Sequence, residues 1–521
     1  MPSEPSLHRA CDRCRRKKAK CDSIDYSCTG CRSAGHSCTF NIAPGKRGPR
    51  GKPRQQIIVR HQGSHDPAPT SCIPPLHLAP TALSSHHPPR LTVLSRFELL
   101  SDAVTNALPF SESLGEVLQQ CTDLFFSYIV PFNMSVHEPT FRRSLGRALA
   151  TSPPASTLTQ VEFTLLTAVC AKVCFFIPSD IFPIGSTLAD IFLDASRSCL
   201  AEYVELDLQH PSADSITIRY LHSNCLHTNA RPIISWHVFG EALRLVQRMR
   251  LHDERSYAPL DPIEAEMRRH AFWQVYTGDK SLAVLRSMPI TITDYAFENR
   301  ITAAYPLVDN NELSIGTNAG IRLWQYAADL ILRIRLLQIN KPLDTPITPT
   351  DQTALSELYI RFATCLDDLP PHLLPESPPS SLFLNNNGTG PKRTRSAVQT
   401  ADLHITYHCL KMHLTRHLEE IGYFSQHVGE RNEMLLLRKT EIAGDMARLL
   451  QAIPFWSLQV NGEPCAEKIR LVGVSLLTLI QEPLSSSSPL VTRARRDFKV
   501  LLDILSRLDS KASDALRLES S

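Results

Sequence analysis

Six cysteines near the N-terminus constrain the fold of this chain more than any other feature of its sequence. Their spacing is C-x2-C-x6-C-x6-C-x2-C-x6-C, so one C-x2-C-x6-C unit is followed by a second copy. The six are Cys11, Cys14, Cys21, Cys28, Cys31 and Cys38. A C-x2-C pair can direct two thiolates to one tetrahedral metal ion, and a closed structural zinc site takes four such ligands.

Six thiolates cannot fill two separate four-ligand sites, because separate sites need eight ligands. Two bridging cysteines supply the difference. The repeat makes Cys11 and Cys28 the natural bridges, since each is the first cysteine of its unit. Disulfides are the main alternative, but they are typical of small secreted domains, and no signal peptide is expected in this chain of 521 residues. The sequence therefore predicts two zinc ions held by six thiolates.

The two cysteine units differ in charge although they share a spacing. The second unit carries only Arg32 between its cysteines, whereas the first is strongly basic. The basic residues of the first unit are Arg13, Arg15, Arg16, Lys17, Lys18 and Lys20. Charges at this density repel one another unless a polyanion neutralises them, and duplex DNA does so with release of counterions. A solvated face that serves as a nuclear-localisation run is the alternative interpretation.

The segment from residue 10 to residue 40 resembles the fungal two-zinc, six-cysteine binuclear cluster transcription factors. ACDRCRRKKAKCD and CTGCRSAGHSCTF match that family at every cysteine and through the basic run. The resemblance implies that a short helix of the first unit enters the major groove and reads a CGG-type triplet. It also implies that Lys17 and Lys18 contact bases, and that Arg15, Arg16 and Lys20 contact phosphates.

The remainder of the chain is expected to differ from this basic segment. Residues 1–60 carry a net charge of +10 and residues 61–521 a net charge of −7. A second basic run follows the cluster, and its glycines and prolines exclude a helix, so it is expected to lie extended along DNA or to act as a localisation signal. This run contains Lys46, Arg47, Arg50, Lys52 and Arg54.

We predict five segments along the chain. Residues 1–45 form the binuclear zinc cluster, and residues 46–95 form a basic, then Pro/His/Ser-rich, disordered linker. Residues 96–374 form a helical regulatory domain, residues 375–396 a disordered loop, and residues 397–521 a C-terminal helical section. Prolines between 44 and 89 leave no heptad pattern after the cluster, so any homodimer is expected to form through the helical body.

The body is predicted to be all-helical, because apolar residues recur at three- and four-residue spacing and period-two runs are scarce. The most apolar stretch, residues 163–177, contains Lys172 and is shorter than the roughly 20 residues of a membrane span. We therefore expect no membrane association. Nine cysteines lie outside the cluster in mostly apolar settings, and we expect buried thiols of an intracellular protein, with Cys170 and Cys174 in the core.

Three stretches of the body, residues 125–141, 234–257 and 264–292, resemble the middle homology domain of the same family. Phe272, Trp273 and Tyr276 share a helix face that is expected to be core, and Arg268 and Arg269 are expected to pair with Asp279 or with nearby carbonyls. The sequences of these three stretches most resemble the corresponding segments of the family's sugar-utilisation regulators. Regulators of secondary metabolism share much of the same sequence.

The resemblance, together with the cysteine spacing and the basic run, implies a nuclear, zinc-dependent transcription factor of RNA polymerase II, an activator whose partners are double-stranded DNA and the transcription machinery. We expect no enzymatic activity, because the sequence contains no phosphate-binding loop, dinucleotide fingerprint, nucleophile elbow or metalloprotease motif. The alternative is a corepressor or scaffold whose zinc cluster mediates protein contacts. The charge difference between the two units argues against it, because a protein-binding module does not need that charge.

Overall fold

The protein divides into two compact units, residues 1–85 and residues 86–521, which we call the head and the body. The computed structural model describes residues 10–17, 19, 21–22, 27–39, 91–108, 113–150, 158–293, 296–298, 300–307, 312–340, 347–375, 391–424, 433–481 and 489–508. Nearly all of the predicted linker, residues 46–90, lies outside the described part of the chain. So do Cys72 and most of the predicted loop.

The head contains two short helices, one in each cysteine unit. Helix α1 (Asp12–Arg16) starts directly after Cys11, and helix α2 (Thr29–Arg32) starts directly after Cys28. Helices of five and four residues are too short to be stable alone in water. The buried residues that join them are cysteines, which form a small cluster without aliphatic or aromatic side chains among the described residues. The fold of the head therefore depends on what its sulfur atoms bind.

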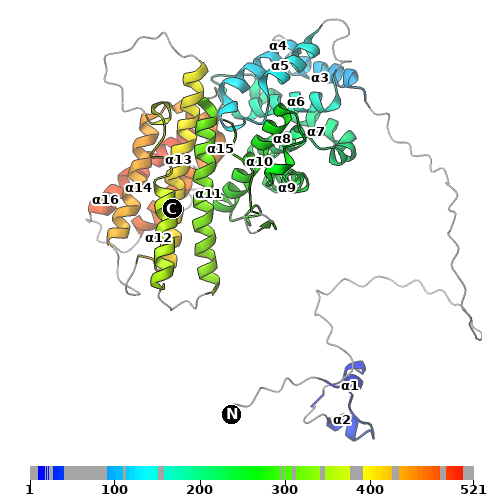
Figure 1. The fold of residues 1–521 in the computed structure, drawn as a ribbon, viewed down its shortest axis with the longest axis vertical. Helices are drawn as coiled ribbons and strands as arrows, with labels where there is room; N and C mark the ends of the chain where they lie inside the picture. Colours follow the sequence, from blue (N-terminus) through cyan, green and yellow to red (C-terminus); the bar gives the residue numbers. More distant parts are fainter. Residues whose placement is uncertain are drawn as a thin grey trace, which may run out of the picture. The chain divides into compact units, whose positions relative to one another are not determined.

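The body is a large assembly of helices, and no strand occurs among its described residues, as the sequence predicts (Figure 1). Its first section runs through α3 (Val93–Ala107), α4 (Leu114–Leu124), η1 (Phe125–Ile129), η2 (Val130–Phe132), α5 (Glu138–Leu149), α6 (Gln160–Phe176), α7 (Gly185–Gln209), α8 (Ala213–Thr228), α9 (Pro232–Arg248), η3 (Glu254–Ser256) and α10 (Pro262–Leu285). Its second section consists of α11 (Glu312–Asn340), α12 (Pro349–Ala363), η5 (Pro371–Leu373), α13 (Pro391–Glu420), α14 (Glu433–Ala452), α15 (Phe455–Gln481) and α16 (Pro489–Arg507).

Helix α6 is the central helix of the first section. A capping box between Thr159 and Glu162 fixes its start. Its apolar residues leave no polar stripe, and a helix that is apolar all round belongs in a core. In the structure α6 contacts α4, α5, α7, α8 and α15, and Lys172 is buried within it. Helix α6 contains the apolar stretch that the sequence analysis identified. No helix in the described part of the chain is long and apolar enough to cross a membrane.

The second section packs around α13, which contacts α11, α14 and α15 (Figure 1). Helix α13 begins at Pro391, so the last residues of the predicted loop, 391–396, are helical. The earlier residues of that loop, 376–390, are outside the described set. Helix α15 is kinked at Gly462, whose φ is +65°, and Pro464 follows the kink. Glycine suits this backbone conformation because it has no Cβ.

The expected core residues of α10 are confirmed. The pairing of its arginines with Asp279 is not found, whereas the alternative of a bond to a nearby carbonyl is found for Arg268. Phe272, Trp273 and Tyr276 are buried together. Asp279 instead pairs with Lys280 and accepts hydrogen bonds from the backbone N–H groups of residues 291 and 292. Arg268 pairs with Glu264 and donates to the carbonyl of Pro211, and Arg269 pairs with Glu254 and Glu266. The carboxylates nearest in space to these arginines lie on their own helix and on the η3 turn.

The cysteines outside the cluster also follow the prediction. Those of the described body carry free thiols, and all are buried except Cys365, which is half-buried. Cys170 and Cys174 belong to the largest apolar core cluster of the body. A small apolar thiol in such surroundings behaves as a packing residue.

Candidate metal centre and nucleic-acid interface

The six cysteines of the head gather into two overlapping groups of four. The first group is Cys11, Cys14, Cys21 and Cys28, and the second is Cys11, Cys28, Cys31 and Cys38. Within each group all sulfur atoms lie within 4.8 Å of one another. Cys11 and Cys28 belong to both groups, which is the arrangement that the spacing of the repeat predicts for two bridging ligands.

The distances between the sulfur atoms fit zinc. Cys11 Sγ lies 3.9 Å from Cys28 Sγ and 3.6 Å from Cys31 Sγ, and Cys28 Sγ lies 3.6 Å from Cys14 Sγ and 3.7 Å from Cys38 Sγ. A tetrahedral zinc with Zn–S bonds of about 2.3 Å separates its sulfur ligands by about 3.8 Å. Each group of four sulfur atoms is therefore compact enough to surround one zinc ion, and a thiolate-rich set is a ligand type that zinc prefers.

Backbone N–H groups support the sulfur atoms in a pattern that repeats between the two units. The N–H of Cys11 donates to Cys21 Sγ, and the N–H of the equivalent Cys28 donates to Cys38 Sγ. The N–H of Cys31 also donates to Cys28 Sγ. Hydrogen bonds from the second shell orient metal ligands and stabilise the thiolate form. The first and last cysteines of each unit are thus held in the same relation to each other.

The crowded thiols have divergent proton affinities. The backbone N–H of Cys14 is the main cause that lowers the pKa of Cys11 to about 6. Cys14 has its pKa raised to about 12, chiefly by its hydrogen bond to Cys11. Adjacent thiolates repel one another, and a divalent cation removes this repulsion. Metal binding at this cluster is therefore linked to the release of thiol protons.

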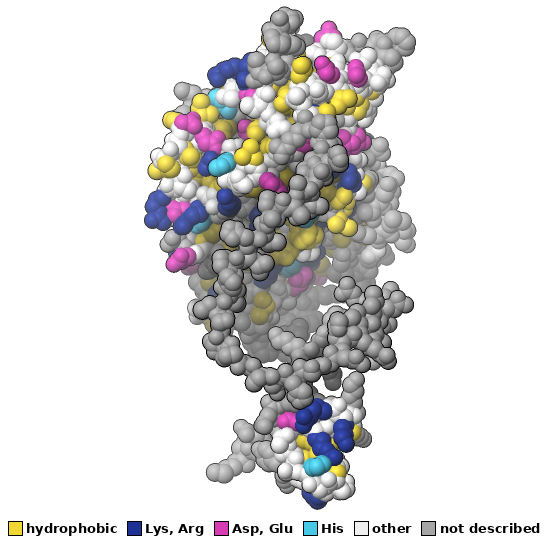
Figure 2. Space-filling view, turned by 90° about the vertical axis from the view of Figure 1, so that its right-hand side faces the viewer, with side chains coloured by type: hydrophobic (Ala, Val, Ile, Leu, Met, Phe, Trp, Pro, Cys, Tyr) yellow, Lys and Arg dark blue, Asp and Glu magenta, His cyan; other side chains and the backbone are white. Residues whose placement is uncertain are grey.

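The basic residues that the structure describes lie on the outside of this cluster. Arg13 is half-buried on α1, whereas Arg16 at the end of α1 and Lys17 in the following turn are exposed. Cys14, on the same short helix, points its sulfur inward. Figure 2 shows the dark blue side chains gathered on the surface of the head, with little acidic surface beside them. One face of α1 therefore carries the metal ligand while the other presents positive charge to solvent.

Several predicted DNA-binding residues lie outside what the structure describes. The backbone of Arg15 belongs to α1 but its side chain is not described, and Lys18, Lys20, Lys46 and Arg47 fall outside the described residues. Their roles stay predictions. Residues 23–26, between the two cysteine units, also lie outside the described part of the chain.

Two aspartates of the head make contacts that join its segments, Asp22 through its side chain and Asp12 through its backbone, and sequence reasoning assigned them no role. The carboxylate of Asp22 accepts a hydrogen bond of 3.0 Å from the N–H of Thr29, the first residue of α2. Asp12 is buried, and its N–H donates to the carbonyl of Thr39 at 2.8 Å, which ties the start of the first unit to the end of the second. An acidic residue beside a cysteine carries no signal in the sequence that identifies such contacts.

Models of two known protein families match segments of this chain, one in the head and one in the body. Residues 9–47 match the fungal Zn(2)-Cys(6) binuclear cluster domain, and residues 122–362 match the fungal specific transcription factor domain. The first match covers the sulfur cluster and the basic residues beside it. The second covers α5 to α12 of the body and ends before α13. The head thus matches a zinc-cluster domain, and a large part of the body matches a domain of transcription factors.

Similar proteins are fungal transcription regulators. The chain is 25% identical over 357 residues to the citrinin biosynthesis transcriptional activators mrl3 of Monascus ruber and ctnR of Monascus purpureus. This match covers 58% of the chain, and 66% and 58% of the length of those two proteins. The glucose transport transcription regulator RGT1 of Kluyveromyces lactis is 56% identical over 50 residues, which are 8% of this chain and 5% of that protein.

Proposed function

We propose that this chain, a transcription regulator with a Zn(2)-Cys(6) binuclear cluster domain and a fungal specific transcription factor domain, activates the genes of a metabolic pathway or gene cluster. It binds CGG-like triplets in the major groove through its head and acts on RNA polymerase II transcription through its body. The observation that carries this proposal is the pair of sulfur groups that share Cys11 and Cys28, next to the exposed basic residues of α1.

The six cysteines hold two zinc ions in this proposal. Cys11 and Cys28 bridge, Cys14 and Cys21 complete one site, and Cys31 and Cys38 complete the other. The metal supplies folding free energy to a unit that lacks an apolar core of its own. With the cluster folded, α1 holds Arg13, Arg16 and Lys17 in a fixed geometry toward solvent.

In this proposal, some basic residues of the head contact DNA bases and others contact phosphates. Lys17 and Lys18 contact bases, because a lysine reaches the O6 and N7 acceptors of guanine in the major groove. The residues that contact phosphates, which fix the register of the head on the duplex without reading its sequence, are Arg13, Arg15, Arg16, Lys20, Lys46 and Arg47. A binding site rich in G and C follows from this division.

The body receives signals and partners, and the protein works in the nucleus. We assign residues 1–45 to the DNA-binding cluster, 46–95 to a linker, 96–374 to the regulatory domain, 375–390 to a loop and the following residues to a C-terminal helical section. The transcription machinery is the partner of the body, and any homodimer forms through it. The body needs no catalytic site for these tasks.

A gene cluster of secondary metabolism is the favoured target. The citrinin activators match 58% of the chain, which is more than the head alone provides, whereas the match to the glucose transport regulator is confined to 8% of the chain. The head is common to regulators of many pathways, so similarity of the body is the more informative of the two. Mapping of chromatin occupancy in the native host tests this assignment, and occupancy mainly at sugar-utilisation genes would contradict it.

Selection from random duplex DNA tests the proposed readout. The full-length protein loaded with zinc should enrich a G/C-rich triplet, and Lys18→Ala should weaken binding to it by roughly 1–3 kcal/mol and relax the preference at one base position. Lys411→Ala, which changes a lysine of α13 in the body, is the matched control and should leave the selected sequence unchanged. A protein that binds zinc but selects no sequence would instead be a corepressor or scaffold.

A further inference from the structure

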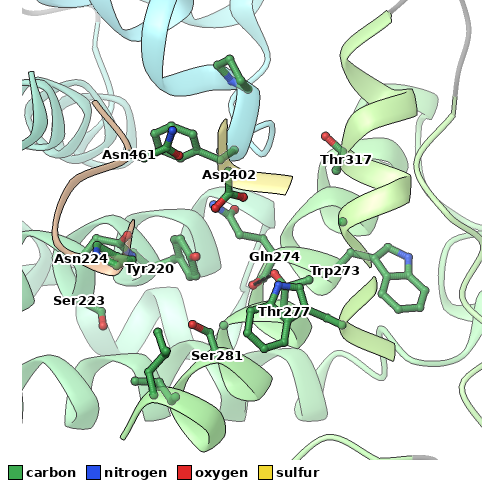
Figure 3. A pocket seen from close by; sticks show the side chains of 18 of the residues that line it. Tyr220, Ser223, Asn224, Trp273, Gln274, Thr277, Ser281, Thr317, Asp402 and Asn461 are labelled. Atoms are coloured by element: carbon green, nitrogen blue, oxygen red, sulfur yellow. Dashed lines mark hydrogen bonds between the residues drawn. The ribbon is translucent and has the colours of Figure 1, made fainter. Parts of the chain in front are cut away.

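The body contains a cavity of about 270 Å³ between its two helical sections. Its volume is slightly below the range that is usual for small-molecule sites, roughly 300–1,000 Å³, so it suits a small ligand. Figure 3 shows polar side chains that point into it from five helices. They are Tyr220, Ser223 and Asn224 of α8, Gln274, Thr277 and Ser281 of α10, Thr317 of α11, Asp402 of α13 and Asn461 of α15.

Aromatic and aliphatic side chains make up much of the remaining lining. Phe132, Phe176, Phe239, Trp273 and Trp324 contribute rings, and leucines of α10 and α13 lie among them. A mostly apolar lining with a few fixed polar groups is typical of ligand sites, because the apolar walls supply binding energy and the polar groups fix the orientation. Aromatic rings in particular pack well against a flat, unsaturated ligand.

Lys172 is the unusual charge of this lining. It is 1% exposed, and its Nζ donates a hydrogen bond of 2.9 Å to the amide oxygen of Asn224. The same Nζ lies 3.1 Å from the ring centroid of Phe176 and 5.8 Å from that of Phe132. No carboxylate of the described residues lies within ion-pair distance of it. A buried ammonium group is costly unless it is paired, so an anion bound beside Lys172 would reduce this cost.

The other charges of the cavity are already balanced. Asp402 accepts a hydrogen bond of 2.8 Å from Lys468, and Glu467 lies 3.4 Å from Arg286 and 3.0 Å from Arg470. Burial lowers the pKa of Lys172 to about 7, because no opposite charge compensates for its desolvation. A carboxylate bound beside Lys172 would favour its charged form and complete a third pair.

We propose that this cavity binds a small aromatic carboxylic acid, with its ring against the aromatic lining and its carboxylate on the ammonium group of Lys172. Neither the zinc cluster nor the DNA-binding residues take part in this binding. An ion pair in surroundings that exclude water is stronger than one on the surface, so the acid is preferred over its neutral analogue.

The place of the cavity in the fold gives the ligand a regulatory role, and this consequence rests on the proposed function. Lys172 and Phe176 belong to α6, whereas Asp402 and Asn461 belong to the second section. The kink of α15 touches this site directly, since a Cβ on Gly462 would lie 3.0 Å from the ring of Phe176. A ligand on Lys172 therefore contacts both sections and favours the arrangement in which they close around it.

Calorimetric titration of the full-length, zinc-loaded protein tests the proposal with two probes of nearly equal shape. 2-Naphthoate carries the carboxylate, and 2-naphthamide replaces it by a neutral amide. We expect saturable binding of one naphthoate per chain, at least about tenfold tighter than binding of the amide, since a factor of ten corresponds to about 1.4 kcal/mol. Heat of binding is measured without DNA, so failure of this test leaves the proposed DNA-binding function untouched.

Three variants locate the site. Lys172→Met keeps the length of the side chain but removes its charge, and should bring the two probes to equal affinity. Ser281→Phe places a ring in the cavity and should abolish binding of both probes. Lys499→Met removes an exposed lysine of α16 that does not line the cavity, and should leave both affinities unchanged. Circular dichroism establishes that each variant is folded.

Several outcomes would overturn the proposal. They are equal affinity of the unaltered protein for acid and amide, absence of saturable binding, and a preference for the acid that survives Lys172→Met. Lys172→Met removes a buried charge and is expected to fold, so the test remains decisive even if Ser281→Phe does not.

Discussion

The head and the body of this protein are held together by opposite means. The head joins two helices of five and four residues through buried cysteines, and its described surface is basic. The body buries aliphatic and aromatic side chains in several large clusters, and its buried charges lie mostly in pairs such as Arg219 with Asp207. We therefore expect stability in the head to depend on a few bonds between its cysteines and zinc, whereas in the body it is distributed over many contacts.

This difference separates two tasks. We expect a head that depends on zinc for its folding to present its basic residues in a single geometry, so that its affinity for DNA is either present or absent. A body with a distributed core can contain a cavity between two sections, and can shift between related arrangements without unfolding. We therefore expect changes in the body to alter regulation but not the sequence that the head recognises.

Removal of zinc should give the largest difference between the two units. Structural zinc contributes about 10–16 kcal/mol to folding of small domains. A chelator should abolish sequence-specific binding of DNA, measured by fluorescence anisotropy, while the thermal transition of the body stays within a few degrees. Elemental analysis should find two zinc ions per chain, and Cys11→Ala should disturb both metals whereas Cys14→Ala should mainly disturb one. A single zinc in reconstituted protein would contradict the shared cluster.

Removal of a buried arginine should give the next largest effect, and only in the body. The guanidinium group of Arg219 is fully buried and donates to Asp207 at 2.6 Å and to the carbonyl of Ser215 at 2.8 Å. Arg219→Met leaves the carboxylate of Asp207 buried without its cation, which costs about 3–5 kcal/mol of unfolding free energy. Urea titration followed by circular dichroism measures the loss.

The exposed pair between Arg448 and Asp445 is the matched control for that variant. Arg448→Met should cost less than about 1 kcal/mol, because water screens a surface pair. Both variants should bind DNA with unchanged affinity under conditions in which the body is folded. Equal losses of stability in the two variants would contradict the view that buried pairs help to hold the body together.

Sequence alone predicted the features of this protein that depend on local spacing. The interval between cysteines is a property of neighbouring residues, and it predicted that Cys11 and Cys28 lie in both sulfur groups. Helical periodicity is equally local, so the all-helical body and the buried face of Phe272, Trp273 and Tyr276 were accessible without a structure.

Contacts between residues that are far apart in the sequence could not be predicted from the sequence. The partners of Asp279 include the backbone N–H groups of residues 291 and 292, and no pattern in the sequence specifies where that segment folds back. Lys172 was recognised only as an interruption of an apolar stretch. Its hydrogen-bond partner is Asn224 of α8, which lies 52 residues further along the chain. Long-range packing decides such contacts, and a single sequence does not encode them in any short motif.

The buried lysine gives a pH-dependent difference within the body. The pKa of Lys172 falls from its ordinary 10.5 to about 7, so between about pH 7 and pH 10.5 the unfolded chain binds more protons than the folded one. Stability therefore rises with pH across this window, and the cost of burying the charge is fully present below pH 7. Lys172→Met should stabilise the body by roughly 2–4 kcal/mol at pH 7, and the gain should vanish toward pH 10.5.

Thermal unfolding of Lys172→Met and of Lys499→Met across this pH range measures the effect. The exposed Lys499 is the control, and its loss should shift stability by the same small amount at every pH. The hydrogen bond from Lys172 to Asn224 is lost in the first variant, which places the expected gain below the full cost of desolvation. A gain that does not depend on pH would contradict the assignment of a buried, unpaired ammonium group.

The smallest expected effect concerns a single exposed arginine of the head. Arg16 ends α1 and its side chain is exposed, a position that suits a phosphate contact. Each phosphate contact contributes about −0.9 to the slope of log K for DNA binding plotted against log salt concentration. Arg16→Gln should therefore make this slope less steep by about 0.9. It should also weaken binding to a triplet-containing duplex and to an unrelated duplex by the same factor, because phosphates carry no sequence information. Arg495→Gln removes an equally exposed arginine of α16 in the body and should leave the slope unchanged. A changed slope in Arg495→Gln would mean that the body also contacts DNA, and the separation of tasks between head and body would then be wrong.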